Sequence, residues 1–328
     1  MKTKLIYIAN FKSKQIFIFK MSHFHKNIEL LQIINICGNG RFIKINPKKK
    51  YLYLGTQFPP KIITYRINKF GLLTQENSIK LQNNPTHFTI NLQGNMLYCA
   101  SYTGNSVTIH PIKDGNVCKK KQILNNLLTC HSVNIDFINK NLWIPCLTIN
   151  KIYLYPINET GYLEESTINF IEMQNNPGPR HMVFHNKKNY AYIINELNGT
   201  VSIISTNKLL IIQTISIHPT ISKNVSSWSA EIYLTINNKW LYCTDRATST
   251  ISCFSVSEKG DELVLIYYKK TENQPYNFDI DVTGKFLAII GKNSHCMSIY
   301  KIDSKTGKLT TYFRKKVGKE PISICFYN

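Results

Sequence analysis

Histidine, arginine and glutamate side chains recur at the ends of strand-like segments from several parts of the chain. A guanidinium donates paired hydrogen bonds to a phosphate or to a developing oxyanion, and a carboxylate or an imidazole can activate water. Brought together, such groups predict a site that binds an anion and activates a water molecule. The residues concerned are His87, His131, Arg180, His181, Glu196 and Arg246.

The elements that must position these side chains form a repeat. Each copy contains an alternating strand, a polar turn and a second alternating strand, as in a β-hairpin. Matching residues stand 45 to 50 positions apart, a period typical of a four-stranded propeller blade. The sequence predicts an all-β, seven-bladed β-propeller with four antiparallel strands per blade, in one domain over residues 1–328. The matching residues are Tyr7, Tyr53, Tyr98, Trp143, Tyr192, Tyr242 and Ala288.

The two ends of the chain are predicted to close this ring. A further alternating strand precedes every hairpin except the first. The segment 321–327, Pro-Ile-Ser-Ile-Cys-Phe-Tyr, has the same pattern. We therefore expect it to supply the innermost strand of the first blade, which would remove the open sheet edges.

Counting along the repeats places two sets of equivalent residues at the start of the inner strands. Neighbouring residues of a strand face opposite ways, so we expect only one set to point fully into the axial channel, although both lie at one rim. Strands alternate in direction, so the turn between the two hairpin strands should lie at that rim too. Three of these equivalent turns carry Tyr102, Glu196 and Arg246. One set is Phe42, His87, Ser132, His181, Glu231, Asn277 and Ser323. The other set is Arg41, Thr86, His131, Arg180, Ala230, Tyr276 and Ile322.

Each of these residues also has a structural interpretation. An arginine beside a carboxylate, as in Asp245-Arg246, is often a structural ion pair. A histidine at the start of a strand is more often a hydrogen-bonded core group than a base. Convergence from four blades on one rim favours the chemical interpretation.

The cysteines and the charge narrow the protein class. Nine cysteines are scattered without a Cys-x-x-Cys pair, which argues against a disulfide framework or a structural zinc. Forty Lys and Arg against 19 Asp and Glu give a net charge of +21. Lysine is spread thinly, with its longest runs at 48–50 and 119–121, so we interpret it as solvated turns and not as a nucleic-acid surface.

The first 20 residues alternate lysine with apolar residues, so they lack the uninterrupted apolar core of a signal peptide. No later segment is as long and apolar as a membrane span. We expect a cytoplasmic protein without a membrane or nucleic-acid partner, acting as a monomer on a small molecule.

Several motifs resemble the 6-phosphogluconolactonase branch of the seven-bladed lactonase propellers, a fold family that includes carboxymuconate-cyclising enzymes. The most specific motif is Gly-Pro-Arg-His-Met at 178–182 followed by Asn-Glu-Leu-Asn at 195–198, and the resemblance runs from about Lys4 to Phe326. It implies hydrolysis of 6-phosphoglucono-δ-lactone to 6-phosphogluconate in the pentose phosphate pathway, without a metal or another cofactor. Further matching segments are 85–87, 101–102, 130–132, 245–246 and 317–318 with Pro321.

The resemblance also implies roles for individual residues. We expect Glu196 or His131 to deprotonate the water and Arg180 to stabilise the oxyanion. The predicted catalytic residues, which resemble the group proposed for the carboxymuconate-cyclising enzymes, are His131, Arg180, Glu196 and Arg246.

A second set is expected to contact the substrate, with Arg246 and either His181 or His87 holding the phosphate. The predicted substrate-binding residues are His87, Tyr102, His181, Asn198 and Arg41. Tyr276 stands in Gln-Pro-Tyr-Asn-Phe, where relatives often have Gln-Pro-Arg-Gly-Phe, so one arginine is missing and Arg41 could compensate for altered residues at this rim.

Three alternatives remain open from the sequence. A metal-dependent sugar lactonase would need oxygen ligands, for which the axial set offers Glu196, Asn198 and Glu231. A lactonase or cycloisomerase for another substrate would use the same fold. A non-enzymatic basic propeller would bind a protein or a nucleic acid with steep salt dependence.

Overall fold

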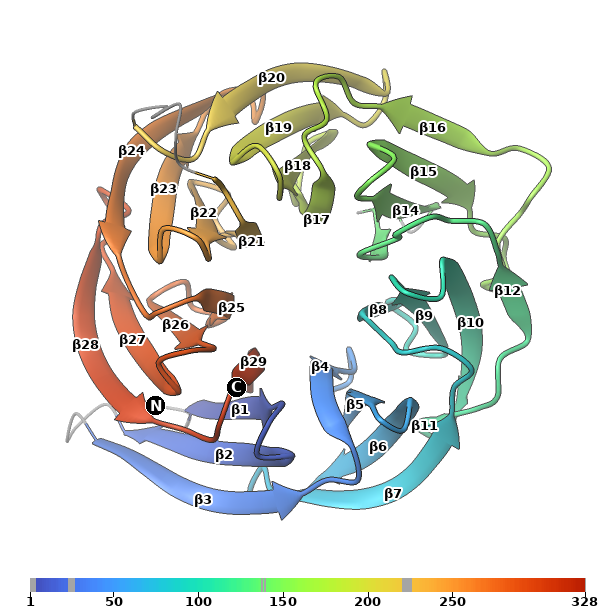
Figure 1. Cartoon of the computed structure of the whole chain (residues 1–328), viewed down its shortest axis with the longest axis vertical. Helices are drawn as coiled ribbons and strands as arrows, with labels where there is room; N and C mark the ends of the chain where they lie inside the picture. Colours follow the sequence, from blue (N-terminus) through green and yellow to red (C-terminus); the bar gives the residue numbers. More distant parts are fainter. Residues whose placement is uncertain (1–3, 23–26, 137, 139, 220–225, 328) are drawn as a thin grey trace.

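Seven β-sheets surround a central axis in the computed structural model, which describes residues 4–22, 27–136, 138, 140–219 and 226–327 (Figure 1). All regular elements in this described part of the chain are strands. Accordingly, the described residues contain no helix that is long and apolar enough to cross a membrane. The seven-bladed all-β propeller predicted from the repeats is confirmed.

The strands of each blade follow one another from the axis outwards. Blade 1 contains β29 (Pro321–Tyr327), β1 (Lys4–Asn10), β2 (Gln15–Ser22) and β3 (Asn27–Asn35). Blade 2 contains β4 (Asn39–Ile45), β5 (Tyr51–Gln57), β6 (Lys61–Ile67) and β7 (Leu73–Lys80). Blade 3 contains β8 (His87–Ile90), β9 (Met96–Ser101), β10 (Ser106–Lys113), β11 (Asn116–Val117) and β12 (Gln122–Leu124).

The remaining blades have the same plan. Blade 4 contains β13 (Asn134–Ile135), β14 (Asn141–Cys146), β15 (Lys151–Pro156) and β16 (Asn169–Glu172). Blade 5 contains β17 (Pro179–Phe184), β18 (Tyr190–Asn195), β19 (Thr200–Ser205) and β20 (Leu210–Ser216). Blade 6 contains β21 (Ser229–Leu234), β22 (Trp240–Asp245), β23 (Thr250–Val256) and β24 (Leu263–Lys270). Blade 7 contains β25 (Pro275–Ile280), β26 (Phe286–Gly291), β27 (Cys296–Ile302) and β28 (Leu309–Lys316).

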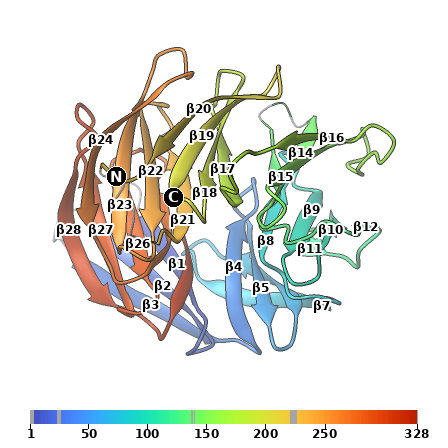
Figure 2. The same cartoon turned by 45° about the horizontal axis from the view of Figure 1, so that its top comes forward.

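The first blade closes the ring as expected. Strand β29 pairs antiparallel with β1, with Tyr7 opposite Cys325, so the two termini lie in one sheet (Figure 1). The tilted view shows the blades standing around the axis with β4, β8, β17 and β21 toward the centre (Figure 2). The third blade differs slightly from the predicted four strands, because its outer strand is divided into β11 and β12, which both pair with β10.

A repeated hydrogen bond joins neighbouring blades. In five blades the matched tyrosine donates its hydroxyl to a glycine carbonyl in the next blade, at 2.6 to 2.8 Å. Gly161 shows why the acceptor is glycine: its φ is +87°, and a Cβ there would lie 2.6 Å from Met96 Cγ. The pairs are Tyr7 with Gly71, Tyr53 with Gly115, Tyr98 with Gly161, Tyr192 with Gly260, and Tyr242 with Gly307.

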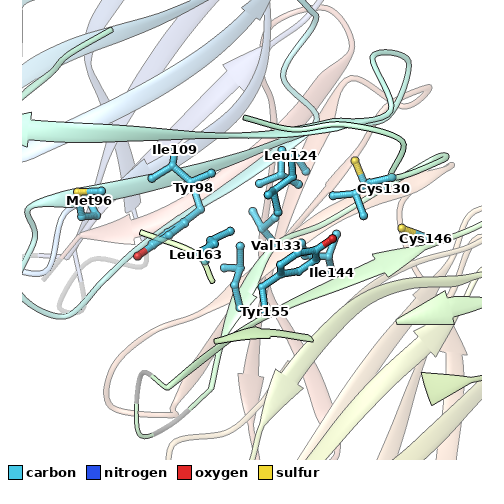
Figure 3. Close-up of a cluster of buried hydrophobic side chains, with 14 residues drawn as sticks. Met96, Tyr98, Ile109, Leu124, Cys130, Val133, Ile144, Cys146, Tyr155 and Leu163 are labelled. Atoms are coloured by element: carbon cyan, nitrogen blue, oxygen red, sulfur yellow. The ribbon is translucent and has the colours of Figure 1, made fainter. Parts of the chain in front are cut away.

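The apolar core fills the seams between blades and not the channel. Between blades 3 and 4, Tyr98, Val133 and Ile144 pack with the side chains of Cys130 and Cys146 (Figure 3). All nine cysteines are free and six are buried, as the scattered pattern predicted. Dense seams of this kind fix the inner strands, and so they hold the residues at the channel rim in place.

Candidate active site

The starts of the inner strands meet at one end of the channel, which we call the mouth. They surround a small cavity of about 20 Å³, enough for one water molecule. Both predicted sets of equivalent residues contribute to its lining, as expected of residues at one rim. The lining residues are Arg41, Phe42, Thr86, His131, Arg180, His181, Glu231, Tyr276, Asn277 and Ile322.

A β-bulge explains why neighbouring residues share the cavity. In blade 5, Pro179 pairs with Asn195 and His181 with Ile194, which leaves Arg180 as the extra residue. Blades 1, 2, 6 and 7 have a register shift at the equivalent place. A bulge turns the local backbone, so both Arg180 and His181 point toward the mouth instead of to opposite faces.

The two most specific motifs are joined by the backbone. Gly178 has a φ of +71°, and a Cβ on it would lie 2.6 Å from Leu197 Cγ. Its carbonyl accepts the Glu196 N–H at 2.7 Å, and the Pro177 carbonyl accepts the Leu197 N–H at 3.0 Å. The glycine therefore lets the segment before β17 lie close against the turn after β18, which sets Glu196 beside Arg180.

Glu196 holds two arginines from adjacent blades. Its Oε2 lies 2.7 Å from Arg180 Nε and 2.7 Å from Arg246 Nη2. Its Oε1 accepts the Trp228 indole N–H at 3.3 Å. Arg180 and Arg246 are only 2% and 6% exposed, so the pairing compensates for the cost of burying two guanidinium groups.

Arg246 is fixed by its own strand end. Its backbone N–H and its Nε both donate to the Trp228 carbonyl, at 3.0 and 3.1 Å, and its guanidinium lies 4.0 Å from the Trp228 ring centroid. Asp245 does not pair with it; that carboxylate accepts the Trp228 and Thr248 N–H groups. Burial and the nearby Arg180 charge lower the pKa of Arg246 to about 10, so Arg246 remains charged at neutral pH.

The field at the mouth favours negative charge. The Tyr276 ring lies 5.9 Å from the Arg180 guanidinium and 5.4 Å from that of Arg246. Burial alone would raise the pKa of the Tyr276 phenol, but four surrounding cations bring that pKa below its ordinary value. These cations are Arg41, Arg180, Arg246 and Lys292. An anionic group would be stabilised at the same place.

A buried histidine–carboxylate pair lies beside this cationic cluster. His181 Nδ1 is 2.6 Å from Glu231 Oε1, and the Asn277 amide donates to Oε2 of the same carboxylate. His181 and Glu231 are 8% and 5% exposed. Burial would raise the pKa of Glu231, but its interaction with His181 and the Arg180 charge hold it below its ordinary value.

Two further histidines pack against His181. The ring centroid of His131 is 4.9 Å from that of His181, and the ring centroid of His87 is 5.3 Å away. Burial, followed by the Arg180 charge, holds the pKa of His131 well below its ordinary value. Burial and the neighbouring His181 have the same effect on the pKa of His87. The ring centroid of Tyr102 lies 5.7 Å from that of His131.

The structure brings together all but one of the predicted site residues. Asn198 is the exception, because it lies exposed in the turn between β18 and β19 and accepts a hydrogen bond from Thr200. Its assignment to substrate binding stays a prediction. Arg41 lines the cavity from blade 2.

Sequence reasoning did not assign the contacts of Glu231, Asn277 and Trp228. A signal existed for Glu231, because it stands 50 positions after His181 at the same place in the repeat. Equal places in adjacent blades meet at the axis, as they also do for Glu196 and Arg246.

The carboxylates proposed for a metal-dependent site have cationic or donor partners instead. Glu196 pairs with Arg180 and Arg246, and Glu231 pairs with His181 and Asn277. Within residues 4–22, 27–136, 138, 140–219 and 226–327, no group of three or more His, Cys, Asp or Glu side chains is arranged to hold a metal ion. A hard divalent cation needs several oxygen ligands, so this donor set does not fit one.

Comparison with known proteins agrees with the repeats and the site. Residues 5–326 match the family model described as "Lactonase, 7-bladed beta-propeller". The chain is 41% identical to a protein of Blochmanniella pennsylvanica named 6-phosphogluconolactonase, over 97% of this chain and 96% of that protein. It is 40% identical to a protein of the same name from Sodalis glossinidius, with 97% of both chains covered.

A solved structure supports the fold over the whole length. The periplasmic gluconolactonase of Pseudomonas aeruginosa superposes with a TM-score of 0.90, covering 100% of this chain and 99% of that one, at 18% identity. An identity this low concerns the fold alone. The matching family model and the relatives at about 40% identity show that the chain belongs to the seven-bladed β-propeller lactonase family.

Proposed function

We propose that this protein hydrolyses 6-phosphoglucono-δ-lactone to 6-phosphogluconate, a step of the oxidative pentose phosphate pathway, at the mouth of its channel. Relatives at about 40% identity over nearly the whole chain bear the name 6-phosphogluconolactonase. The structural observation that carries the proposal is the convergence of two buried guanidinium groups, Arg180 and Arg246, on Glu196. A third arginine, Arg41, lines the same cavity as Arg180.

The cationic groups match the two negative charges of the reaction. A δ-lactone is an activated ester, and attack by water places negative charge on its carbonyl oxygen. The substrate also carries a phosphate at the far end of the sugar. Arg180 lies beside the cavity and stabilises the oxyanion in this scheme, while Arg246 and Arg41 contact the phosphate. The cavity beside His131 and His181 accommodates the attacking water.

The first test compares two lactones with purified, chelator-treated protein. We expect faster loss of 6-phosphoglucono-δ-lactone than spontaneous hydrolysis gives, and a much smaller acceleration for the unphosphorylated lactone. Equal acceleration of both lactones would point to another sugar lactone as the substrate, consistent with Tyr276 replacing an arginine at the rim. No acceleration of either, with or without divalent metal, would contradict the proposal.

We also propose that the protein acts in the cytoplasm as a monomer, without a nucleic-acid or membrane partner. The support is the distribution of its charge, because the lysine runs at 48–50 and 119–121 are exposed segments between strands of two different blades, blades 2 and 3. Light scattering after size-exclusion chromatography tests the monomer, and steep salt-dependent binding to duplex DNA would contradict the absence of a nucleic-acid partner.

A further inference from the structure

The mouth contains three candidate bases, and their hydrogen bonds distinguish them. A base that activates water needs a free lone pair and a proton affinity matched to neutral pH. Both oxygens of Glu196 are already engaged: Oε2 lies 2.7 Å from Arg180 Nε and from Arg246 Nη2, and Oε1 accepts the Trp228 indole N–H. A carboxylate placed between two guanidinium groups is positioned to orient them.

His131 is also poorly suited. Its Nδ1 is enclosed and has no hydrogen-bond partner among the described residues. Among the residues that the structure describes, no carboxylate is hydrogen-bonded to its ring. Burial, Arg180, His181, Arg246 and His87 all lower the pKa of His131.

His181 differs from the other two in having a carboxylate partner. Glu231 lies 2.6 Å from Nδ1 and is itself fixed by the Ile232 N–H at 3.2 Å and by the Asn277 amide. Asn277 is held in turn, because its Oδ1 accepts the Ile324 N–H at 3.0 Å. Three inner strands, β21, β25 and β29, thus fix one imidazole on β17.

This arrangement determines the tautomer of His181. An ionised Glu231 only accepts hydrogen bonds, so the proton of a neutral His181 lies on Nδ1. Nε2 then carries the lone pair, and it makes no hydrogen bond to any residue in the described ranges. Because His181 lines the water-sized cavity, Nε2 is the nitrogen available to a water there.

We infer that His181, oriented by Glu231, is the general base that activates water in lactone hydrolysis, and that Glu196 is a positioning residue for Arg180 and Arg246. The inference rests on the proposed lactonase activity. It replaces the expectation that Glu196 or His131 would take the proton, and it moves His181 from phosphate binding to catalysis.

The reaction balances with this one imidazole. Nε2 takes a proton from water as the water oxygen bonds to the lactone carbonyl carbon, and the carbonyl oxygen becomes the oxyanion beside Arg180. The ring C–O bond then breaks, and the imidazolium returns its proton to the leaving ring oxygen. The products are a carboxylic acid, which ionises in water, and a free hydroxyl group. Glu231 stays ionised throughout and stabilises the transient imidazolium.

The charges around His181 set the expected pH dependence. Burial lowers the pKa of His181, Glu231 on β21 opposes that shift, Arg180 on β17 adds to it, and Glu196 in the next turn opposes it. His87 and His131 face the same ring and are uncharged at neutral pH. The wild-type rate should therefore be flat near pH 7 and fall only below the ordinary histidine range of about 6.5.

Three variants test the assignment by kinetics. We expect His181→Gln to lower kcat by about 10²-fold or more with KM within about threefold. Glu231→Gln should also lower kcat. Glutamine replaces one acceptor oxygen with an NH₂ group, and this donor would face another donor, either the His181 N–H or the Asn277 amide. This variant should also move the acid limb of the pH profile to lower pH, since the carboxylate that raises the pKa of His181 is gone. Glu196→Gln keeps one acceptor oxygen for Arg180 and Arg246, so it should lower kcat less than His181→Gln does and should leave the acid limb of the pH profile in place.

Glu272→Gln is the matched control for losing a buried carboxylate. Glu272 is 4% exposed and binds Ser298 and Arg314, away from the cavity. This variant should lose stability but keep its kcat and its pH profile. Retention by His181→Gln of more than about a tenth of the wild-type kcat would overturn the inference, as would an unshifted pH profile in folded Glu231→Gln.

Nitrogen-15 NMR of the histidine side chains tests the pair without substrate. The expected result at pH 7 is a neutral His181 with its proton on Nδ1, converted to the other tautomer or to a mixture in Glu231→Gln. A proton on Nε2 in the wild-type protein would overturn the inference, whatever the turnover. Absence of lactone turnover in the wild type would instead contradict the proposed function, so the two failures are distinguishable.

Discussion

The two ends of the channel are built by the same inner strands but differ in geometry and chemistry. At the mouth, five blades have a bulge or register shift, and charged side chains surround a cavity of about 20 Å³. The opposite end has regular pairing and a cavity of about 420 Å³, in which Asp136 is the one carboxylate among the described lining residues. Its lining residues are Thr89, Ile90, Leu92, Ile135, Asp136, Val183, Phe184, Asn186, Tyr233 and Leu234.

The comparison shows that cavity size does not identify the reactive end. The larger cavity has no arginine or histidine among its described lining residues, so it lacks groups that bind phosphate or activate water. The smaller one concentrates them because each bulge turns an additional side chain toward the axis. Substitutions at the two ends and in the seams test this contrast, from the largest expected effect to the smallest.

Replacing Arg180 should have the largest effect. Arg180→Met keeps much of the side-chain volume but removes the guanidinium that lies beside the cavity, so the oxyanion loses its donor. We expect kcat/KM for 6-phosphoglucono-δ-lactone to fall by about 10²- to 10³-fold in steady-state kinetics. Circular dichroism should show a folded protein, and a loss below about tenfold would contradict the assigned role.

Replacing Arg41 should affect binding more than turnover. Arg41 lines the cavity from blade 2 and contributes to the positive field around Tyr276. In Arg41→Gln we expect KM for the phosphorylated lactone to rise by about tenfold while kcat stays within about twofold. The unphosphorylated lactone is the internal control, and an equal change for both substrates would show that Arg41 does not contact the phosphate.

Removing a seam hydrogen bond should change stability and leave turnover intact. Tyr98→Phe leaves the Gly161 carbonyl without its 2.7 Å donor inside the seam. We expect the free energy of unfolding in urea to fall by about 1 kcal/mol. A change in kcat of more than about twofold would mean that this seam and the mouth are coupled.

A change at the opposite end should have the smallest effect. Leu92 is 67% exposed at the rim of the larger cavity. Leu92→Ser should leave kcat and KM within about twofold of the wild type and the unfolding free energy within about 0.5 kcal/mol. A loss of turnover comparable to that of Arg180→Met would reverse the interpretation of the two ends.

The repeat was sufficient to predict the architecture and the rim. Spacing of the matched tyrosines predicted the blades, and the pattern of 321–327 predicted that β29 would join β1. The rim residues could be predicted because the start of each inner strand is counted directly from the repeat. The side chains that face the cavity could not be predicted, because strict alternation fails at a β-bulge. Nothing in the sequence Pro179-Arg180-His181 indicates that a bulge forms there.

The sequence also did not predict which side chains pair between adjacent blades. The sequence placed Arg246 beside Asp245, but the turn directs Asp245 toward backbone N–H groups and Arg246 toward Glu196. His181 and Glu231 similarly stand far apart in sequence, and they meet because adjacent blades bring equal repeat positions together. Contacts of this kind depend on the rotation between blades, which the period alone does not specify.

The most direct test of the central claim is a crystal structure with the product, 6-phosphogluconate, bound. The account predicts the phosphate within hydrogen-bonding distance of Arg41 or Arg246 and the carboxylate beside Arg180 and His181 at the mouth. Product bound only in the larger cavity at the opposite end, against Thr89 and Tyr233, would contradict it.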